Sequence, residues 1–86
     1  MNLESMKRVR EGLGGLLEKE MDDRIKIWAW VRLGGERCVD VAHRFGYKDG
    51  SMITYILRRL PLVAQNNPKI LNQMLQIEKY VSRFKS

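Results

Sequence analysis

The stretch FGYKDGSMITYILRRLP, residues 45–61, decides how the rest of the chain is interpreted. Its first half holds two glycines and two charged residues, and its second half has the apolar spacing of a short helix that ends at Pro61. Because glycine favours turns, the stretch predicts a turn that leads directly into a helix. Such a segment either joins two core helices or aims the start of the second helix at a polyanion.

Residues on both sides of this turn have helical periodicity. Residues 36–45 predict a helix with Val39, Ala42 and Phe45 on its buried side. The next helix is expected over 51–60 and to close before Pro61, since the residue preceding a proline avoids helical dihedrals. Its inward positions are Met52, Ile53, Ile56, Leu57 and Leu60. Residues 36–60 therefore have the spacing of a helix-turn-helix.

The flanking segments are also helical in pattern. A helix over 3–11 is expected to stop at Gly12-Leu13-Gly14-Gly15, because each glycine costs a helix about 1 kcal/mol relative to alanine. A longer helix over 22–33, with Asp22 or Asp23 as N-cap, is expected to end at Gly34-Gly35. Asn67-Pro68 predicts the start of a last helix over 67–84. The prediction is one all-α domain, residues 1–86, of five or six helices, with residues 1–21 as an N-terminal helix and glycine turn.

Charge is concentrated in the second half of the chain. The net charge is +6; residues 1–35 hold seven basic and six acidic groups, and residues 36–86 hold nine and four. An excess of this kind favours nucleic acid or another acidic surface as partner. The turn and helix at 45–61 lie in the basic half.

Several classes of protein do not fit the sequence. The lone Cys38 has no disulfide partner, and with a single histidine, His43, no metal constellation is expected. The sequence contains no phosphate-binding loop, no paired carboxylates and no nucleophile beside a base. We therefore expect neither an enzyme nor a cofactor or small-molecule substrate. No apolar run is long enough for a membrane span and no signal peptide is evident, so the expected location is the cytoplasm.

The outward face of the 51–60 helix has chemistry suited to duplex DNA. Ser51, Thr54 and Tyr55 form hydrogen bonds and suit base edges, whereas Arg58 and Arg59 follow one turn later and suit phosphates.

The turn before that helix adds three candidate residues. Lys48 is either a solvated turn residue or a phosphate contact beside the free amides of the helix start. Asp49 is expected to cap the helix, and a carboxylate there also accepts from a cytosine amino group. Gly50 leaves the backbone bare, so that a phosphate can approach it.

A family resemblance is carried by CVDVAHRFGYKDGSMITYILRRL, residues 38–60. It resembles the C-terminal duplex-binding domain of the bacterial replication initiator DnaA, with matching positions at Phe45, Gly46, Lys48, Asp49, Ser51, Ile53, Arg58 and Leu60. It is also similar to the variant of this domain at the C-terminus of transposase-like proteins of the REP-associated tyrosine class. The resemblance spans about residues 22–84 and implies a helix-turn-helix fold like domain IV of DnaA or the Trp repressor.

The resemblance implies roles for particular residues in binding double-stranded DNA. Asp49 and Ser51 would stand at the base-reading start of the recognition helix, with Tyr55 facing the groove. Lys48, Arg58 and Arg37 would lie near phosphates. Independently of the resemblance, Gly34 and Gly35 are expected near the flanking phosphates together with Arg37.

Two departures from the family pattern change the expectation. Gly50 replaces the family's histidine, which removes a major-groove donor. The acidic run 18–23 replaces a basic loop that enters the minor groove. The target sequence of DnaA is therefore not expected.

A second hypothesis is a helical protein–protein interaction or dimerisation module without DNA binding. Residues 1–21 place Leu3, Met6, Leu13 and Leu17 at heptad-like spacing, which suits a partner helix or a second copy of the chain. The target DNA, the oligomeric state and the presence of further domains stay open at this stage.

Overall fold

The computed structural model describes residues 3–18 and 22–83, with the side chains of residues 3–6 excepted. Its elements are α1 (Leu3–Leu17), α2 (Asp23–Trp28), the π-helix η1 (Ala29–Leu33), α3 (Cys38–Arg44), α4 (Ser51–Gln65) and α5 (Pro68–Ser82). No strand occurs in these ranges. The prediction of a small all-α domain is confirmed.

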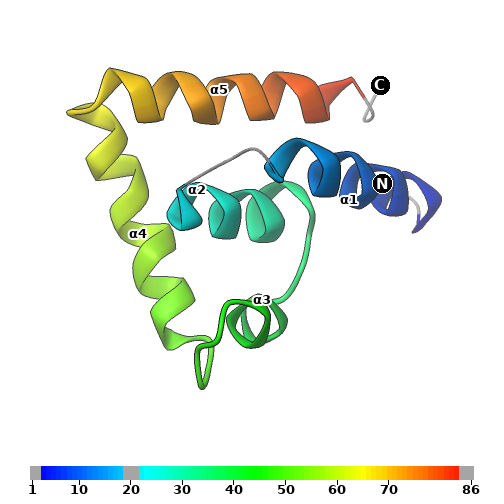
Figure 1. Ribbon diagram of the computed structural model, residues 1–86, viewed down its shortest axis with the longest axis horizontal. Helices are drawn as coiled ribbons and strands as arrows, with labels where there is room; N and C mark the ends of the chain where they lie inside the picture. Colours follow the sequence, from blue (N-terminus) through cyan, green and yellow to red (C-terminus); the bar gives the residue numbers. More distant parts are fainter. Residues whose placement is uncertain (1–2, 19–21, 84–86) are drawn as a thin grey trace.

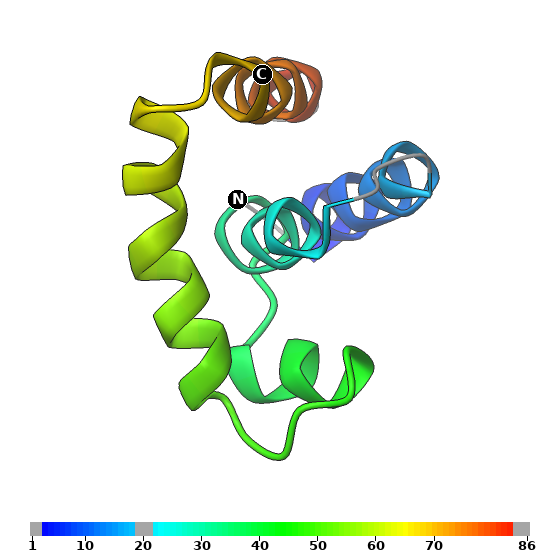
Figure 2. The same ribbon diagram turned by 60° about the vertical axis from the view of Figure 1, so that its left-hand side comes forward.

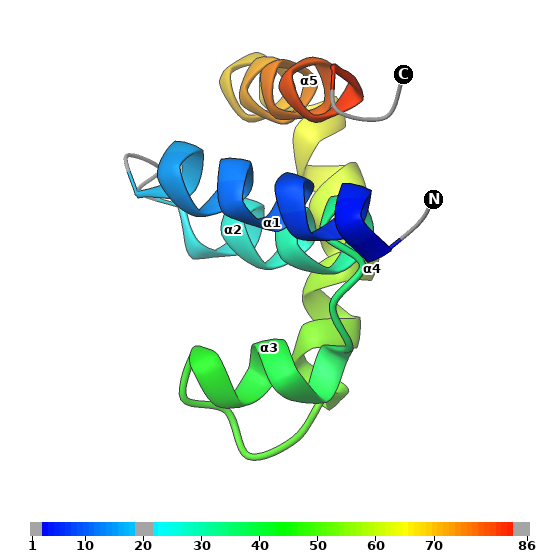
Figure 3. The same ribbon diagram turned by 90° about the vertical axis from the view of Figure 1, so that its right-hand side faces the viewer.

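The long helix α4 joins the two ends of the molecule. It begins beside α3 at one end and reaches α5 at the other, along the left side of Figure 1. The helices α2 and η1 lie between these ends, and α1 contacts η1 and α5 (Figure 3). In Figure 2 the turn between α3 and α4 lies at the end of the molecule opposite α5. The turn between α3 and α4 therefore forms one end of the molecule, while α4 itself packs along α2 and against α5.

The core is shared by all the described helices, because Val41 and Ala42 of α3 and Ala29 of η1 are fully buried as well. Its fully buried side chains include Leu13 of α1, Ile25 and Ile27 of α2, and Ile53 and Leu60 of α4. At about 25 cal/mol per Å² of buried apolar surface, side chains of this size contribute about 1.5–3 kcal/mol each. The buried side of α4 thus packs into the same core as α1 and α2.

Two predicted helix starts are confirmed by their caps. The Asp22 carboxylate accepts a hydrogen bond from the backbone N–H of Arg24 at 2.9 Å. The Asn67 side-chain oxygen accepts from the backbone N–H of Ile70 at 3.4 Å, with Pro68 in the first turn. Both caps use only local chemistry, which explains why they are readable from sequence.

The predicted break at Gly12–Gly15 is wrong, because α1 continues through all of these residues to Leu17. Leu13 is fully buried among them. The helical φ and ψ angles at the glycines are maintained because burying Leu13 and Leu17 offsets the glycine cost. A Cβ at Gly14 would lie 3.9 Å from the Trp30 ring, an ordinary van der Waals distance, so the packing of α1 on η1 does not require glycine there.

The predicted helix over 22–33 is present as two segments. The α-helix changes after Trp28 to the π-helix η1, where the Gly34 N–H donates to the Ala29 carbonyl at 2.9 Å. Trp28 is buried in the core, while Trp30 is half-buried and packs against it. The two tryptophans therefore differ in role, with Trp28 in the core and Trp30 covering it.

The predicted end of the 51–60 helix at Leu60 is also wrong, since α4 continues past Pro61 to Gln65. Proline removes the N–H that would bond the Leu57 carbonyl. Leu60 and Ala64, on either side of it, are buried, and Pro61 itself lies on the solvent side. Packing of the two buried neighbours outweighs the lost bond.

The last helix ends at Ser82 rather than at residue 84, and Phe84 lies outside the described residues. Residues 19–21 of the acidic run, and the side chains of Leu3 and Met6, lie outside them too. Within residues 3–18 and 22–83, no helix has both the length and the apolar character needed to cross a membrane.

Candidate nucleic-acid interface

The turn between α3 and α4 has a geometry set by two glycines. Gly46 has φ of 85°, in the left-handed region that glycine adopts without strain, and the Tyr47 N–H donates to the Ala42 carbonyl at 2.8 Å. A Cβ at Gly50 would lie 3.2 Å from the Cβ of Cys38. Gly50 therefore lets the start of α4 approach the start of α3.

This contact is a structural reason for glycine at residue 50, which the sequence alone did not show. The approach of Cys38 leaves little room for a side chain at residue 50. A Cβ at this position would require Cys38 to move by a few tenths of an ångström, so glycine suits the close packing of the two helices.

Polar groups at the start of α4 are paired by hydrogen bonds within the turn. Asp49 Oδ1 accepts from both the backbone N–H and the hydroxyl of Ser51. The Thr54 hydroxyl donates to the Gly50 carbonyl at 3.1 Å. Hydrogen bonds from the Ser51 hydroxyl and backbone hold the pKa of Asp49 below its ordinary value. Asp49 therefore satisfies the first amide of α4 from a position just before its N-cap residue, Gly50.

Two arginines of the unit are engaged within the chain. Arg37 Nε lies 3.0 Å from Asp40 Oδ2, one turn along α3. Arg44 Nη1 lies 2.9 Å from Glu36 Oε2 with the geometry of an ion pair rather than a directed hydrogen bond, and its Nη2 donates to Oε1 at 3.0 Å. The Arg44 guanidinium also lies 4.8 Å from the centre of the Trp30 ring. Arg37, although exposed, is thus partly neutralised.

The other cations of the unit have no ion-pair partner within the described residues. Lys48, Arg58 and Arg59 are exposed, and the Arg59 guanidinium lies 5.6 Å from the centre of the Tyr55 ring. No acidic residue occurs between Asp49 and Glu78, so α4 is free of negative charge over its whole length. This face of α4 is therefore polar, aromatic and positive.

One residue of this face was not among the predicted site residues. Met52, predicted to point inward, is 44% exposed and stands one turn before Tyr55, which is 54% exposed. Ile53 is fully buried on the core side of α4, and Met52 lies about 100° from it around the helix axis. Val39 of α3, also predicted inward, is 39% exposed.

Gly34 does not lie on an open surface as the sequence reading expected. It is buried, and its carbonyl accepts a hydrogen bond from Arg10 Nε of α1 at 2.9 Å. A Cβ there would lie 2.8 Å from the Trp30 carbonyl oxygen. Gly35 has φ of 70° and its carbonyl accepts from the same guanidinium at 3.4 Å. Both glycines serve the connection between η1 and α3.

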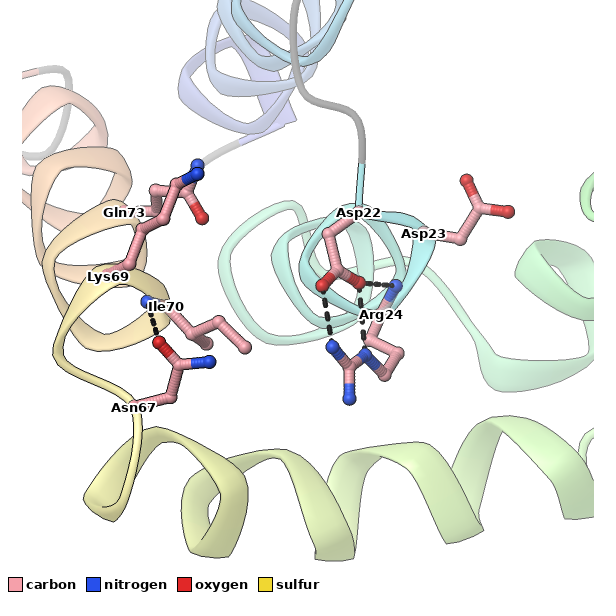
Figure 4. A pocket seen from close by; sticks show the side chains of 7 residues that line it. All are labelled: Asp22, Asp23, Arg24, Asn67, Lys69, Ile70 and Gln73. Carbon is pink, nitrogen blue, oxygen red and sulfur yellow. Dashed lines mark hydrogen bonds and ion pairs between the residues drawn. The ribbon is translucent and has the colours of Figure 1, made fainter.

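An open depression of about 530 Å³ lies elsewhere, between the starts of α2 and α5 (Figure 4). Arg24 bonds the Asp22 carboxylate there with both Nε and Nη2, and this contact lowers the Asp22 pKa. The depression contains none of the predicted site residues; it is lined by Asp22, Asp23, Arg24, Asn67, Lys69, Ile70 and Gln73. Among the described side chains, no three histidine, cysteine or acidic groups gather where they could hold a metal ion.

Comparison with known proteins adds no relative. No protein-family model, no curated protein and no solved structure matches the chain. The resemblance to the DnaA domain therefore stays a prediction, and the candidate interface is argued from its own residues.

Proposed function

We propose that this chain binds double-stranded DNA, with α4 in a major groove. The observation that carries the proposal is the solvent face of α4, where Arg58 and Arg59 follow a hydrogen-bonding helix start on a helix without acidic residues. Phosphate oxygens are the most frequent DNA partners of arginine and lysine, and an α-helix fits the width of the major groove.

The position of the unit supports the same proposal. The turn between α3 and α4 lies at one end of the molecule, opposite α5, so a duplex can approach without meeting the other helices (Figure 2). Lys48 lies in this turn and is exposed. It is placed to contact a phosphate flanking the groove that α4 occupies, while Arg37 contributes less because Asp40 partly neutralises it.

The proposed role is that of a DNA-binding module in a replication-initiator-like or transposase-related bacterial protein. It carries no catalytic step and needs no cofactor. The proposed setting is the cytoplasm, where bacterial duplex DNA lies and where the free Cys38 stays reduced. A single half-site gives limited affinity, so specific binding would require a dimer or an attached domain.

The test is a duplex titration at two salt concentrations. Lys48→Ala and Arg58→Ala are expected to weaken binding to every sequence, because both remove phosphate contacts. Lys79→Ala removes the same charge from α5 and serves as the matched control, with little effect expected. Equal losses for all three variants would show that only net charge matters, and absence of duplex binding at low salt would overturn the proposal.

An interaction module without DNA binding is the second candidate. Leu13 and Leu17, which suggested it, are buried in the chain's own core. Two other leucines now favour it: Leu71 and Leu75, one turn apart on α5, are exposed. Sedimentation tests this candidate by comparing the oligomeric state of the wild type with that of a Leu71→Ala/Leu75→Ala variant. Association through an apolar interface is expected to respond little to salt.

A further inference from the structure

The start of α4 offers hydrogen-bond acceptors rather than donors. The Ser51 hydroxyl donates to Asp49, and the Thr54 hydroxyl donates to the Gly50 carbonyl. A serine or threonine hydroxyl has one hydrogen, so each of these groups retains only acceptor lone pairs for a ligand. Asp49, as a carboxylate, is an acceptor only. This end of the helix can meet amino groups of bases but cannot use these side chains to donate to guanine.

An apolar pair lies directly beside these acceptors. Met52 and Tyr55 are 44% and 54% exposed and stand three positions apart, so they are neighbours on the solvent face of α4. Three residues of helix correspond to about 4.5 Å along its axis, which is close to one base step of about 3.4 Å. The spacing of Met52 and Tyr55 along the helix axis therefore allows them to contact the edge of one base pair or of two adjacent base pairs.

The charge around this pair fits DNA as its occupant. Arg59 lies over the Tyr55 ring, Arg58 is exposed beside it, and no acidic residue follows on α4. The base edges of the major groove present a single apolar group, the C5-methyl of thymine, within a rim of phosphates. An apolar pair flanked by arginines is complementary to that arrangement.

We propose that α4 recognises thymine through its C5-methyl group, with Met52 and Tyr55 as the contacting side chains. This inference rests on the proposed duplex binding and makes Met52, rather than Ser51 or Thr54, a residue that determines specificity. The partner class is duplex DNA that places thymine where the start of α4 enters the groove. The acceptors of Asp49, Ser51 and Thr54 complement the adenine amino group of the same base pair.

The experiment removes the methyl groups and nothing else. One random-sequence duplex pool is made twice, once with thymine and once with deoxyuridine at every thymine position. Both pools compete for limiting protein in one tube, and the bound duplexes of each kind are counted. Burial of one methyl predicts a preference of about fourfold for thymine duplexes, and of more when two methyls are contacted.

Variants assign the preference to its side chains. In a Met52→Ala/Tyr55→Ala protein the thymine-to-uracil ratio is expected to fall to one, since both contacts are gone. The exposed Leu71→Ala of α5 is the control in which the ratio stays at the wild-type value. Circular dichroism of each variant checks that the helices are retained.

The outcomes separate this inference from the function on which it rests. A wild-type ratio of one, with duplexes retained, overturns the methyl contact and leaves duplex binding intact. A ratio that survives in the double variant overturns the assignment to Met52 and Tyr55. If neither pool is retained at low salt, the proposed function itself fails.

Discussion

Replacing Gly15 by alanine should stabilise the protein, although glycine-rich segments usually mark turns. Gly15 lies inside α1, is exposed, and a Cβ built on it meets nothing within 4 Å. Alanine is better than glycine in a helix interior by about 1 kcal/mol, and the position near the helix end reduces this gain to about 0.5–1 kcal/mol. No steric cost opposes the gain.

The stabilisation is large enough to measure by thermal unfolding. For a domain of 60–100 residues, 0.5–1 kcal/mol corresponds to a rise in Tm of about 2–8 °C. The assay is circular dichroism during heating, with a urea titration to obtain the free energy of unfolding at 25 °C.

Gly46→Ala provides the matched control with the opposite sign. The added Cβ again meets nothing within 4 Å, but φ of 85° makes alanine unfavourable by about 1–2 kcal/mol. The two variants therefore separate backbone conformation from steric fit. A Gly15→Ala protein that unfolds at a lower temperature than the wild type would refute a helix through this segment and restore the turn that the sequence predicts.

Three further changes have expected outcomes. Gly34→Ala should lower the free energy of unfolding by about 1–3 kcal/mol in urea titrations, because its Cβ would lie 2.8 Å from a backbone carbonyl oxygen that cannot move freely. Asp40→Ala should release Arg37 for phosphate and steepen the salt dependence of duplex binding by about 0.9 in log–log slope; an unchanged slope would show that Arg37 lies off the interface. Asp49, whose pKa in the folded state is depressed below 3.8, stabilises the fold above that pH and loses this contribution as the pH falls through the folded value. Unfolding of the wild type and Asp49→Asn, compared from pH 6 to pH 2, should therefore show a difference that shrinks only below about pH 4; a constant difference would contradict the linkage.

The sequence predicts those features of the fold that depend on local chemistry. The caps at Asp22 and Asn67 and the turn at Gly46 were predictable because a carboxylate, an amide or a missing Cβ acts on the adjacent backbone. Features set by packing were not predictable in the same way. The helix through Gly12–Gly15 depends on the burial of Leu13 and Leu17 in a core whose other members follow later in the chain.

The candidate site shows the same division. The exposed positions of Tyr55, Arg58 and Arg59 follow from helical periodicity. The orientation of Met52 depends on the direction in which α4 packs, which the periodicity alone leaves uncertain by about one position. The pairing of Arg37 with Asp40 has a sequence signal at i and i+3, which could have shown that not every arginine of the unit is available.

The most direct test of duplex binding is the salt dependence of the wild-type protein's affinity for a mixed-sequence duplex. Contacts from Lys48, Arg58 and Arg59 to phosphates predict a slope of about −2.7 in log K against log salt, or a loss of about 40-fold in affinity between 50 and 200 mM salt. No binding at 50 mM, or binding that does not change with salt, would contradict a major-groove role for α4.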